Sequence, residues 1–291
     1  MEVVHVPVMQ EEVLEALKIK DNGVYIDATV GLGGHSKNIL NHAGGCTLIG
    51  IDRDDKALEI AKERLTGFEN VHFVRESFSN IKSVAEDLGY DRVNGILLDI
   101  GVSMLHLKSE DRGFSFLSDD FLDMRMDSRQ DLTAEKIVNR YREKELADII
   151  WRYGDERFSR RIAKAIVYTR QKKPVKSCKE LAGIIERAVR RRGRIHPATR
   201  TFQALRIEVN KELDELTAVI DAAPDILARE GRLCVISYHS LEDRIVKNSF
   251  KALAKEGLFK IITKKPLVPG RQEQITNPSS RSAKMRVGEK I

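Results

Sequence analysis

An apolar run that leads directly into a glycine-rich turn constrains the fold of this chain more than any other feature. The run covers Val24 to Asp27, and the turn is Ala28-Thr-Val-Gly-Leu-Gly-Gly-His-Ser36. Gly31, Gly33 and Gly34 accept positive φ angles and let backbone amides approach a ligand closely. Ser36 then suits the cap of a following helix. The pattern predicts a strand, a nucleotide-binding turn and a helix.

A second acidic residue narrows the choice of ligand. The apolar run Thr47 to Ile51 ends at Asp52, where a carboxylate reaches the ribose hydroxyls of a bound nucleoside. The glycine spacing differs from the G-x-G-x-x-G of dinucleotide sites, and the carboxylate of Asp27 suits a cationic sulfonium or amino group better than phosphates. We therefore expect S-adenosylmethionine as the ligand. A dinucleotide and a tight turn without a ligand are the two alternatives.

Strand and helix patterns alternate in the first part of the chain, which predicts right-handed βαβ units and a parallel sheet. The expected strands are residues 24–28, 47–51, 71–75 and 93–100, and the expected helices are residues 37–42, 56–65 and 81–88. Helical periodicity alone follows over residues 134–153, 160–169, 179–189 and 198–220, before strand patterns resume at residues 232–237, 259–263 and 284–287. We expect a discontinuous α/β domain, residues 1–104 and 222–291, split by an all-helical insertion, residues 105–221.

The expected insertion carries most of the positive charge. The whole chain has a net charge of +6, whereas residues 140–211 contain 21 Lys and Arg against 8 Asp and Glu. Phosphates are bound mainly through Lys and Arg, so this segment indicates a polyanion such as RNA as its partner. Ordinary solvated helix faces are the alternative.

Composition favours a globular protein of the cytoplasm. The 291 residues, 42% of them hydrophobic, suffice for one large core and a smaller second one. The first residues show no signal-peptide pattern, and no apolar run reaches the length of a membrane span, so we expect no membrane partner. Cys46, Cys178 and Cys234 lie far apart without a C-x-x-C pair, so we expect neither a metal site nor a disulfide framework.

Two polar segments follow expected strands and supply candidate chemistry. The first, Asp99-Ile-Gly-Val-Ser103, places Asp99 at the sheet edge that would bind the cofactor. Methyl transfer to the exocyclic amine of a pyrimidine needs an acceptor that orients the amine and takes up developing positive charge, and Asp99 suits that role. A turn-forming or helix-capping Asp is the alternative.

The second segment is Ser237-Tyr-His-Ser-Leu-Glu-Asp-Arg244, in which His239 suits a proton relay. The alternative is that Tyr238 and His239 only pack and that Ser240 caps a helix. Methylation of carbon 5 of cytosine would need a reactive thiol in such a loop, and Cys234 lies within the apolar strand instead. Carbon-5 chemistry is therefore disfavoured.

Taken together, these motifs are similar to those of the bacterial methyltransferases of the RsmH or MraW family. The resemblance spans nearly the whole chain. Besides the segments at 27–36, 99–103 and 237–244, it depends on His5-Val-Pro-Val-Met9, Arg112-Gly-Phe-Ser-Phe116, Leu122-Asp-Met-Arg-Met-Asp127 and Ile195-His-Pro-Ala-Thr-Arg-Thr-Phe-Gln-Ala-Leu-Arg-Ile-Glu-Val-Asn210.

The resemblance implies a class I methyltransferase fold, S-adenosylmethionine as methyl donor and the N4 amine of a decoding-centre cytidine in 16S rRNA as acceptor. Naked rRNA and the small ribosomal subunit are both open as the substrate, and a monomer and a homodimer are both open. Other open readings are a nicotinamide-linked oxidoreductase, a methyltransferase of another RNA, and a non-catalytic RNA-binding assembly factor. Carried over by residue, the implied cofactor contacts are Gly33, Gly34, His35, Asp52, Phe78, Asp99 and His106, to which the turn itself adds Asp27 and Gly31.

The resemblance is incomplete at one point. Amine methyltransferases usually carry Asp/Asn-Pro-Pro-Tyr/Phe where this chain has Asp99-Ile-Gly-Val, so the residue that stacks on the target base must come from the insertion or from Tyr238. Trp151 and Tyr153 are candidates, with burial in a helix core as their alternative. The expected RNA contacts are Arg190, Arg191, Arg192, Arg194, Arg200 and Arg206.

Overall fold

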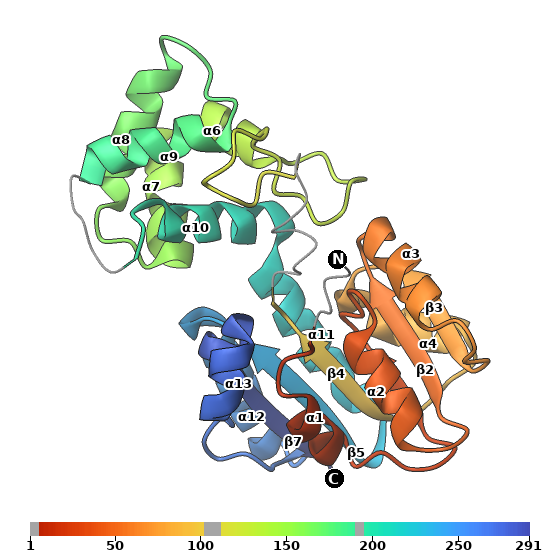
Figure 1. The fold of residues 1–291 in the computed structure, drawn as a ribbon. Coiled ribbons are helices and arrows are strands. Elements are labelled where there is room, and N and C mark those ends of the chain that lie inside the picture. Colours follow the sequence, from red (N-terminus) through yellow and green to blue (C-terminus); the bar gives the residue numbers. More distant parts are fainter. Residues whose placement is uncertain (1–5, 102–111, 190–194) are drawn as a thin grey trace. The chain divides into compact units, whose positions relative to one another are not determined.

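The computed structural model describes residues 6–101, 112–189 and 195–291 and divides the chain into two compact units. One unit combines residues 1–103 with residues 213–291 and contains the sheet. The other, residues 104–212, contains helices (Figure 1). Among the residues that the structure describes, no helix combines the length and the apolar character that a membrane span requires.

Seven strands form one sheet in the order β3-β2-β1-β4-β5-β7-β6. All neighbours from β3 to β5 are parallel, whereas β7 is antiparallel to both β5 and β6. The bounds are β1 Val24–Asp27, β2 Thr47–Asp52, β3 Val71–Arg75, β4 Val93–Asp99, β5 Leu227–Ser237, β6 Phe259–Ile261 and β7 Lys284–Lys290. The order reverses between β1 and β4, which is where open α/β sheets bind their ligands.

Alternate strand residues face two separate cores, as expected for a sheet covered on both sides. One face packs against α4 (Ile81–Asp87), α11 (Glu212–Ile226) and α12 (Ser240–Lys255). The other packs against α1 (Gln10–Leu17) and α2 (Gly34–His42). In β1, for example, Ile26 belongs to the first core and Tyr25 to the second. This mostly parallel sheet between helices confirms the predicted class I α/β fold.

Three further elements complete the sheet unit. The helix α3 (Asp55–Arg64) follows β2 and is capped by Asp54, whose side chain accepts a hydrogen bond from the amide of Lys56. The short helix η1 (Phe78–Asn80) follows β3, and α13 (Arg271–Thr276) with η2 (Pro278–Ser282) precedes β7.

The helical unit contains α6 (Ala134–Arg140), α7 (Glu143–Gly154), α8 (Ser159–Arg170), α9 (Cys178–Val189) and α10 (Ala198–Asn210). The central helix α7 contacts both α8 and α10, and α8 also contacts α9. The apolar positions repeat at helical spacing, so each helix buries one face; in α8 the buried apolar residues are Ile162, Ala163 and Ile166.

Two of the expected long helices are interrupted. The helix predicted over 134–153 breaks after Arg140, because the backbone of Tyr141 is extended. Arg142 is the N-cap of α7, and its amide donates to the Glu145 carboxylate at 2.7 Å. The helix predicted over 198–220 breaks at Lys211, whose φ is 52°.

The break at Lys211 also moves a boundary. Residues of α11 such as Leu216 and Ile220 pack in the core against the sheet. The compact helical unit therefore ends at 212 and not at 221, where we had expected the insertion to end.

Candidate active site

The carboxyl ends of four parallel strands bring the predicted polar residues to one edge of the sheet. Asp27, Asp52 and Asp99 are the last residues of β1, β2 and β4, and Tyr238 directly follows β5. Parallel neighbours end on the same side, so these side chains form one cluster within the sheet unit.

Asp27 is a buried carboxyl group held by hydrogen bonds. It is 1% exposed, accepts from the Ser36 hydroxyl at 2.7 Å and accepts from the amide of Thr29 at 3.3 Å. Burial raises the pKa of Asp27 against the opposing effect of His35 and these hydrogen bonds. A buried carboxylate is costly unless a positive group lies beside it, so this position favours a cationic ligand.

The glycine turn after β1 has the backbone geometry that its sequence predicts. Gly31 and Gly33 have φ angles of 50° and 76°, and Gly33 is the N-cap of α2. The prediction that Ser36 caps this helix is wrong, since Ser36 lies within its first turn and its hydroxyl binds Asp27. A Cβ atom on Gly34 would lie 2.6 Å from Cγ of Pro7, so the turn is packed tightly under the N-terminal segment.

Asp52 connects the end of β2 with that turn. One carboxylate oxygen accepts from the amide of Gly31 at 2.9 Å, and the other accepts from the amide of Asp54 at 2.9 Å. Both hydrogen bonds fix the carboxylate at the start of the β2–α3 loop. Such an oriented acid next to a glycine turn is what a nucleoside ribose requires.

Asp99 is held from three directions. Its amide donates to Oγ1 of Thr29 at 2.7 Å, and its Oδ1 accepts from the Tyr238 hydroxyl at 2.7 Å. Its Oδ2 lies 3.6 Å from Nε2 of His35. Burial, followed by the charge of Asp99 and its hydrogen bond, raises the pKa of Tyr238 well above its ordinary value. Tyr238 therefore stays protonated and keeps donating to Asp99.

Gly101 makes room for this tyrosine. A Cβ atom at Gly101 would lie 2.7 Å from Cε2 of Tyr238, closer than side chains tolerate. The ring of Tyr238 therefore requires a glycine at position 101. The sequence alone gave no sign of the contact, because the two residues belong to different strands.

His35 supplies the polar atoms that point to a ligand. It is 8% exposed, and within the described parts of the chain neither of its ring nitrogens has a hydrogen-bond partner. Buried polar groups are normally paired, so an unpaired imidazole beside Asp27 and Asp99 indicates a missing partner. A bound ligand would supply that partner.

His239 is the N-cap of the helix α12. Its Nδ1 accepts from the amide of Glu242 at 3.4 Å, and the Glu242 carboxylate accepts from the amides of Tyr238 and His239 at 2.7 and 3.1 Å. The alternative in which Ser240 caps this helix is wrong, since Ser240 is the first helical residue. The reciprocal bonds fix the backbone beside Tyr238.

Phe78 lies behind the end of β3 and is 8% exposed. The guanidinium of Arg53 lies 5.3 Å from the centre of its ring and is paired with Glu215 at 2.7 Å. Most of the ring packs in the core shared with α4 and α11. It therefore offers only a small part of its surface as an apolar wall.

The predicted RNA contacts divide into two groups. The first group lies outside the described residues and consists of Arg190, Arg191, Arg192 and Arg194. The predicted cofactor residue His106 lies outside the described residues as well. Arg206 forms a bidentate ion pair with Glu212, with both N···O distances at 2.8 Å, and its side chain is 15% exposed. Arg200 donates to the carbonyl of Asp155 at 3.0 Å and is more exposed. Both arginines thus have partners in the helical unit.

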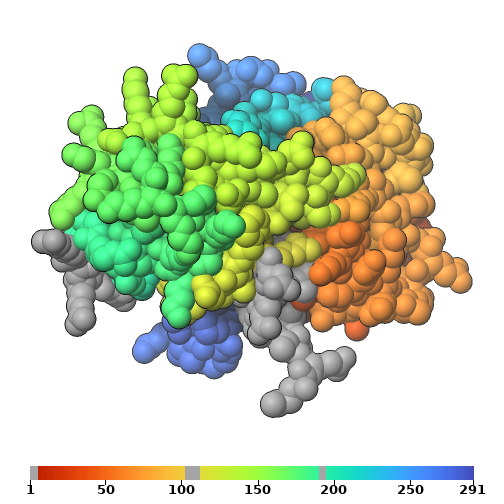
Figure 2. Space-filling model, turned by 90° about the horizontal axis from the view of Figure 1, so that it is seen from above, coloured from red at the N-terminus to blue at the C-terminus, as the bar shows by residue number. Residues whose placement is uncertain are grey.

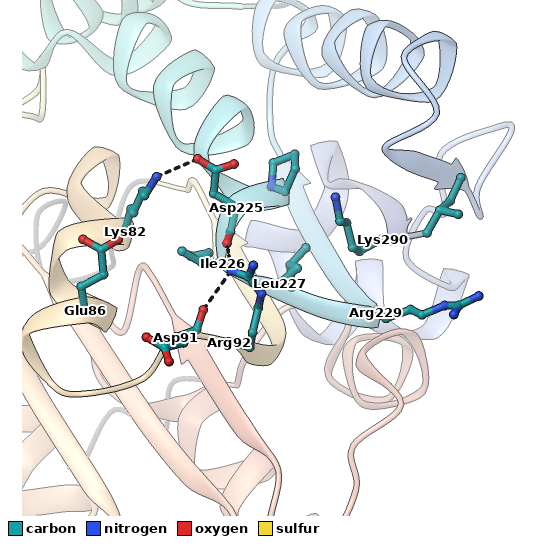
Figure 3. A pocket seen from close by; sticks show the side chains of 11 residues that line it. Lys82, Glu86, Asp91, Arg92, Asp225, Ile226, Leu227, Arg229 and Lys290 are labelled. Carbon is teal, nitrogen blue, oxygen red and sulfur yellow. Dashed lines mark hydrogen bonds and ion pairs between the residues drawn. The ribbon is translucent and has the colours of Figure 1, made fainter.

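A pocket of about 740 Å³ lies at the opposite edge of the sheet, where β4 and β5 begin (Figure 3). Lys82 is paired there with Asp225 at 2.8 Å, and Arg92 donates to the backbone carbonyl of Asp225. These contacts join α4 to α11 and do not converge on a ligand. The pocket is separate from the cluster around Asp99.

Comparison with known proteins agrees with this geometry. A sequence profile of the MraW methylase family matches residues 2–291. The chain belongs to the MraW methylase family. The ribosomal RNA small subunit methyltransferase H of Sulfurihydrogenibium sp. (strain YO3AOP1) is 51% identical over 291 residues, which cover 99% of both chains. The methyltransferase H of Clostridium botulinum (strain Kyoto / Type A2) is 48% identical over 313 residues, with 100% of both chains covered.

A solved rRNA methylase from Streptococcus thermophilus covers 97% of this MraW-family chain and 93% of its own, at 12% identity and a TM-score of 0.45. The family assignment depends on the sequence matches alone.

The residues at the strand ends of this MraW-family protein fit S-adenosylmethionine. The buried carboxyl group of Asp27 suits a positive charge, the turn at Gly31 and Gly33 leaves room for backbone approach, and Asp52 suits a ribose. The ring nitrogens of His35, which lack a hydrogen-bond partner among the residues that the structure describes, offer a further polar contact. A methyl donor bound here would lie next to Asp99.

Proposed function

We propose that this protein is an S-adenosylmethionine-dependent methyltransferase of small-subunit rRNA that acts on the N4 amine of a decoding-centre cytidine in 16S rRNA. The observation that carries the proposal is the position of Asp99 beside the glycine turn, with its carboxylate fixed by the Tyr238 hydroxyl and its backbone amide bonded to Thr29. The printed names of the relatives support small-subunit rRNA as the substrate. The resemblance of the sequence motifs supports cytidine N4 as the acceptor atom.

The proposed cofactor residues are those that surround the ends of β1, β2 and β4. Asp27 and His35 would face the charged methionine part of the ligand, and Asp52 would bind the ribose hydroxyls. The backbone at Gly31, Gly33 and Gly34 would line the turn, and Phe78 would contact adenine with its exposed edge. His106 stays a prediction, since it lies outside the described residues.

The proposed role of Asp99 is to orient the acceptor amine. The lone pair of an exocyclic amine is delocalised into the pyrimidine ring, so the nitrogen is a weak nucleophile that needs in-line alignment. A hydrogen bond from the amine to Asp99 would align it and stabilise the positive charge that develops on nitrogen. The nitrogen forms a bond to the methyl carbon, the carbon–sulfur bond breaks with its electron pair on sulfur, and the proton that the nitrogen loses passes to the Asp99 carboxylate or to water.

Tyr238 would act as a positioning residue in this reaction. Its hydroxyl holds Oδ1 of Asp99, so that Oδ2, on the side of His35, would be the oxygen that accepts from the amine. Because burial and Asp99 raise the pKa of Tyr238, the phenol does not compete for the amine proton. His239 would hold the backbone of this tyrosine through Glu242, and its role as a proton relay stays a prediction.

We assign recognition of the rRNA to the helical unit, since its sequence carries the excess of positive charge. The experiment that tests the function is transfer of labelled methyl from S-adenosylmethionine to naked 16S rRNA and to small subunits from cells that lack this gene. Label on one cytidine as N4-methylcytidine supports the proposal. Asp99→Asn is the control, since it keeps an acceptor for Tyr238 but removes the charge. Binding of S-adenosylmethionine without label on either rRNA would contradict it.

A further inference from the structure

One face of α8 gathers exposed cations around an exposed aromatic ring. Arg160, Lys164 and Tyr168 recur every four residues, Arg161 lies next to Arg160 and three residues before Lys164, and all four are exposed. Lys172 lies four residues after Tyr168, just beyond the end of the helix, and is exposed too. This spacing places them on one side of the helix, while Ile162, Ala163 and Ile166 are buried on the other. We call these five exposed residues the α8 basic face. The helical unit that contains α8 is coloured yellow-green to green in Figure 2.

The cations of this face have no acidic partners among the residues that the structure describes. Neighbouring cations differ in this respect, because Lys173 is paired with Glu180 at 3.0 Å and Arg170 donates to the carbonyls of Val138 and Tyr141. The helix α8 itself contains no acidic residue. The positive charge of the α8 basic face, unlike that of Arg170, is therefore neither neutralised by an acidic residue of the described chain nor used to hold the helical unit together.

The position of these cations also works against the helix. Arg160 and Arg161 lie in the first turn of α8, where the macrodipole is positive and favours acidic residues. Arg160 and Lys164 are separated by four residues, a spacing at which like charges repel each other. Helix stability gives no reason for this arrangement, whereas binding of a polyanion does.

Tyr168 adds a second kind of contact. Its side chain is 61% exposed, and the ammonium of Lys172 lies 4.5 Å from the centre of its ring. An exposed aromatic ring beside cations is the usual platform for an unpaired base next to its phosphates. A purely electrostatic surface would not need the ring.

We propose that the α8 basic face is a binding surface for single-stranded or looped rRNA, with Arg160, Arg161 and Lys164 on phosphates and Tyr168 stacked on an unpaired base. The inference rests on the proposed function in that rRNA is the expected polyanion. The cations of the α8 basic face take the place of Arg206 as the proposed phosphate contacts, because that arginine is paired with Glu212. The uncompensated charge favours RNA over a protein partner.

The test measures binding and methylation of a 16S rRNA fragment that contains the decoding centre. The variant Arg160→Ala/Arg161→Ala/Lys164→Ala removes three cations while keeping good helix formers. If each cation contacts one phosphate, the slope of log affinity against log salt concentration is smaller by about 2 in the variant. Raising the salt from 50 to 200 mM therefore lowers the RNA affinity of the parent protein about 16-fold more than that of the variant. The melting temperature stays the same or rises, because the first turn loses unfavourable charges.

A matched control removes the same number of exposed cations elsewhere. Lys247, Lys251 and Lys255 lie exposed along α12, whose first turn contains Glu242 and Asp243. Lys247→Ala/Lys251→Ala/Lys255→Ala is expected to leave the salt slope unchanged. Equal losses in the two triple variants would overturn the proposal, since the effect would then be one of net charge.

Tyr168 is tested by two substitutions. Tyr168→Ala is expected to weaken RNA binding about five- to a hundredfold, while Tyr168→Phe keeps the ring and binds like the parent. Tyr168→Ala is expected to raise the KM for RNA, and Tyr168→Phe is expected to leave it unchanged. Neither substitution is expected to change the KM for S-adenosylmethionine. Parent-like affinity and salt slope in the α8 variants would overturn the inference while methylation by the parent still supports the function. Loss of RNA binding in those variants, when the parent binds but does not methylate, would support the surface and contradict the function.

Discussion

The phenolic hydroxyl of Tyr238 donates to Oδ1 of Asp99 at 2.7 Å, and the two residues stand 139 positions apart in the sequence. They follow neighbouring strands of the sheet, so the contact depends on correct pairing of β4 with β5. It fixes a carboxylate that would otherwise rotate freely at the sheet edge. Several of the expected effects of substitution follow from this relationship.

Tyr238→Phe removes the hydroxyl and keeps the ring against Gly101. A hydrogen bond to a charged group contributes about 1.5–3 kcal/mol, so kcat is expected to fall about 10- to 100-fold if the bond acts in the transition state. Binding of S-adenosylmethionine, measured by calorimetry, is expected to change little. A parent-like kcat would show that Asp99 needs no positioning.

Gly101→Ala introduces a Cβ atom into the space that the Tyr238 ring occupies. The ring must shift, so we expect a loss of kcat at least as large as that of Tyr238→Phe. Gly270→Ala is the matched control, because a Cβ atom at Gly270 meets nothing within 4 Å and its backbone is extended. Steady-state rates of the two alanine variants give the comparison, and equal rates would contradict the steric argument.

Asp27→Asn is expected to stabilise the ligand-free protein and to weaken S-adenosylmethionine binding. A carboxyl group whose pKa is raised by folding favours the folded state in acid, and this contribution is lost as the pH rises through the raised pKa. Since asparagine does not titrate, the variant gains stability over the parent with rising pH, and the two differ least in acid. Each kcal/mol gained raises Tm by about 2–4 °C.

The measurement for Asp27→Asn is thermal unfolding between mildly acidic and neutral pH, together with ligand affinity. A variant that is less stable than the parent at neutral pH would show that the hydrogen bonds from Ser36 and Thr29 outweigh the cost of the buried charge.

Glu273 ties α13 to the N-terminal segment. Its carboxylate accepts from the amide of Met9 at 2.8 Å, and Met9 is fully buried. Glu273→Ala leaves that amide unpaired, at a cost of about 1–3 kcal/mol in the free energy of unfolding. The neighbouring Pro7 packs on Gly34 of the cofactor turn, so affinity for S-adenosylmethionine is expected to fall as well. Glu273→Gln keeps an acceptor and should restore both.

Arg206→Ala tests whether this arginine is structural. The change leaves Glu212, whose side chain is 7% exposed, without its bidentate partner. Breaking a buried pair costs about 3–5 kcal/mol, which urea unfolding would detect as a lower midpoint. Adding Glu212→Ala should recover part of the loss. An unchanged midpoint with weaker RNA binding would instead restore Arg206 as an RNA contact.

The cofactor edge was predictable from the sequence because its signals are local. The apolar run of β1, the glycines after it and the acid that ends β2 lie within one βαβ unit, whose geometry follows from turn chemistry and strand burial. The helix α1 was missed, although Val13, Ala16 and Leu17 repeat at helical spacing and are buried. That spacing is the sequence signal that predicts it.

The remaining features depend on tertiary contacts. Lysine has no preference for the left-handed region, so nothing in the sequence marks Lys211 as the end of α10. The charge of Arg206 was visible but its partner Glu212 was not, and the same holds for the tyrosine that orients Asp99. Histidine is an unusual N-cap, so the alternative that the sequence offered for the cap of α12 was the neighbouring serine.

The insertion of the helical unit between β4 and β5 has a consequence for folding. Pairing of these two strands must close a very long loop, and such non-local contacts form late. The helices of the inserted unit depend on closer neighbours in the chain and are expected to form first. Since Asp99 and Tyr238 meet only when β4 and β5 pair, a refolding chain acquires its chemistry in its last step, and the return of activity would time the closure of the sheet.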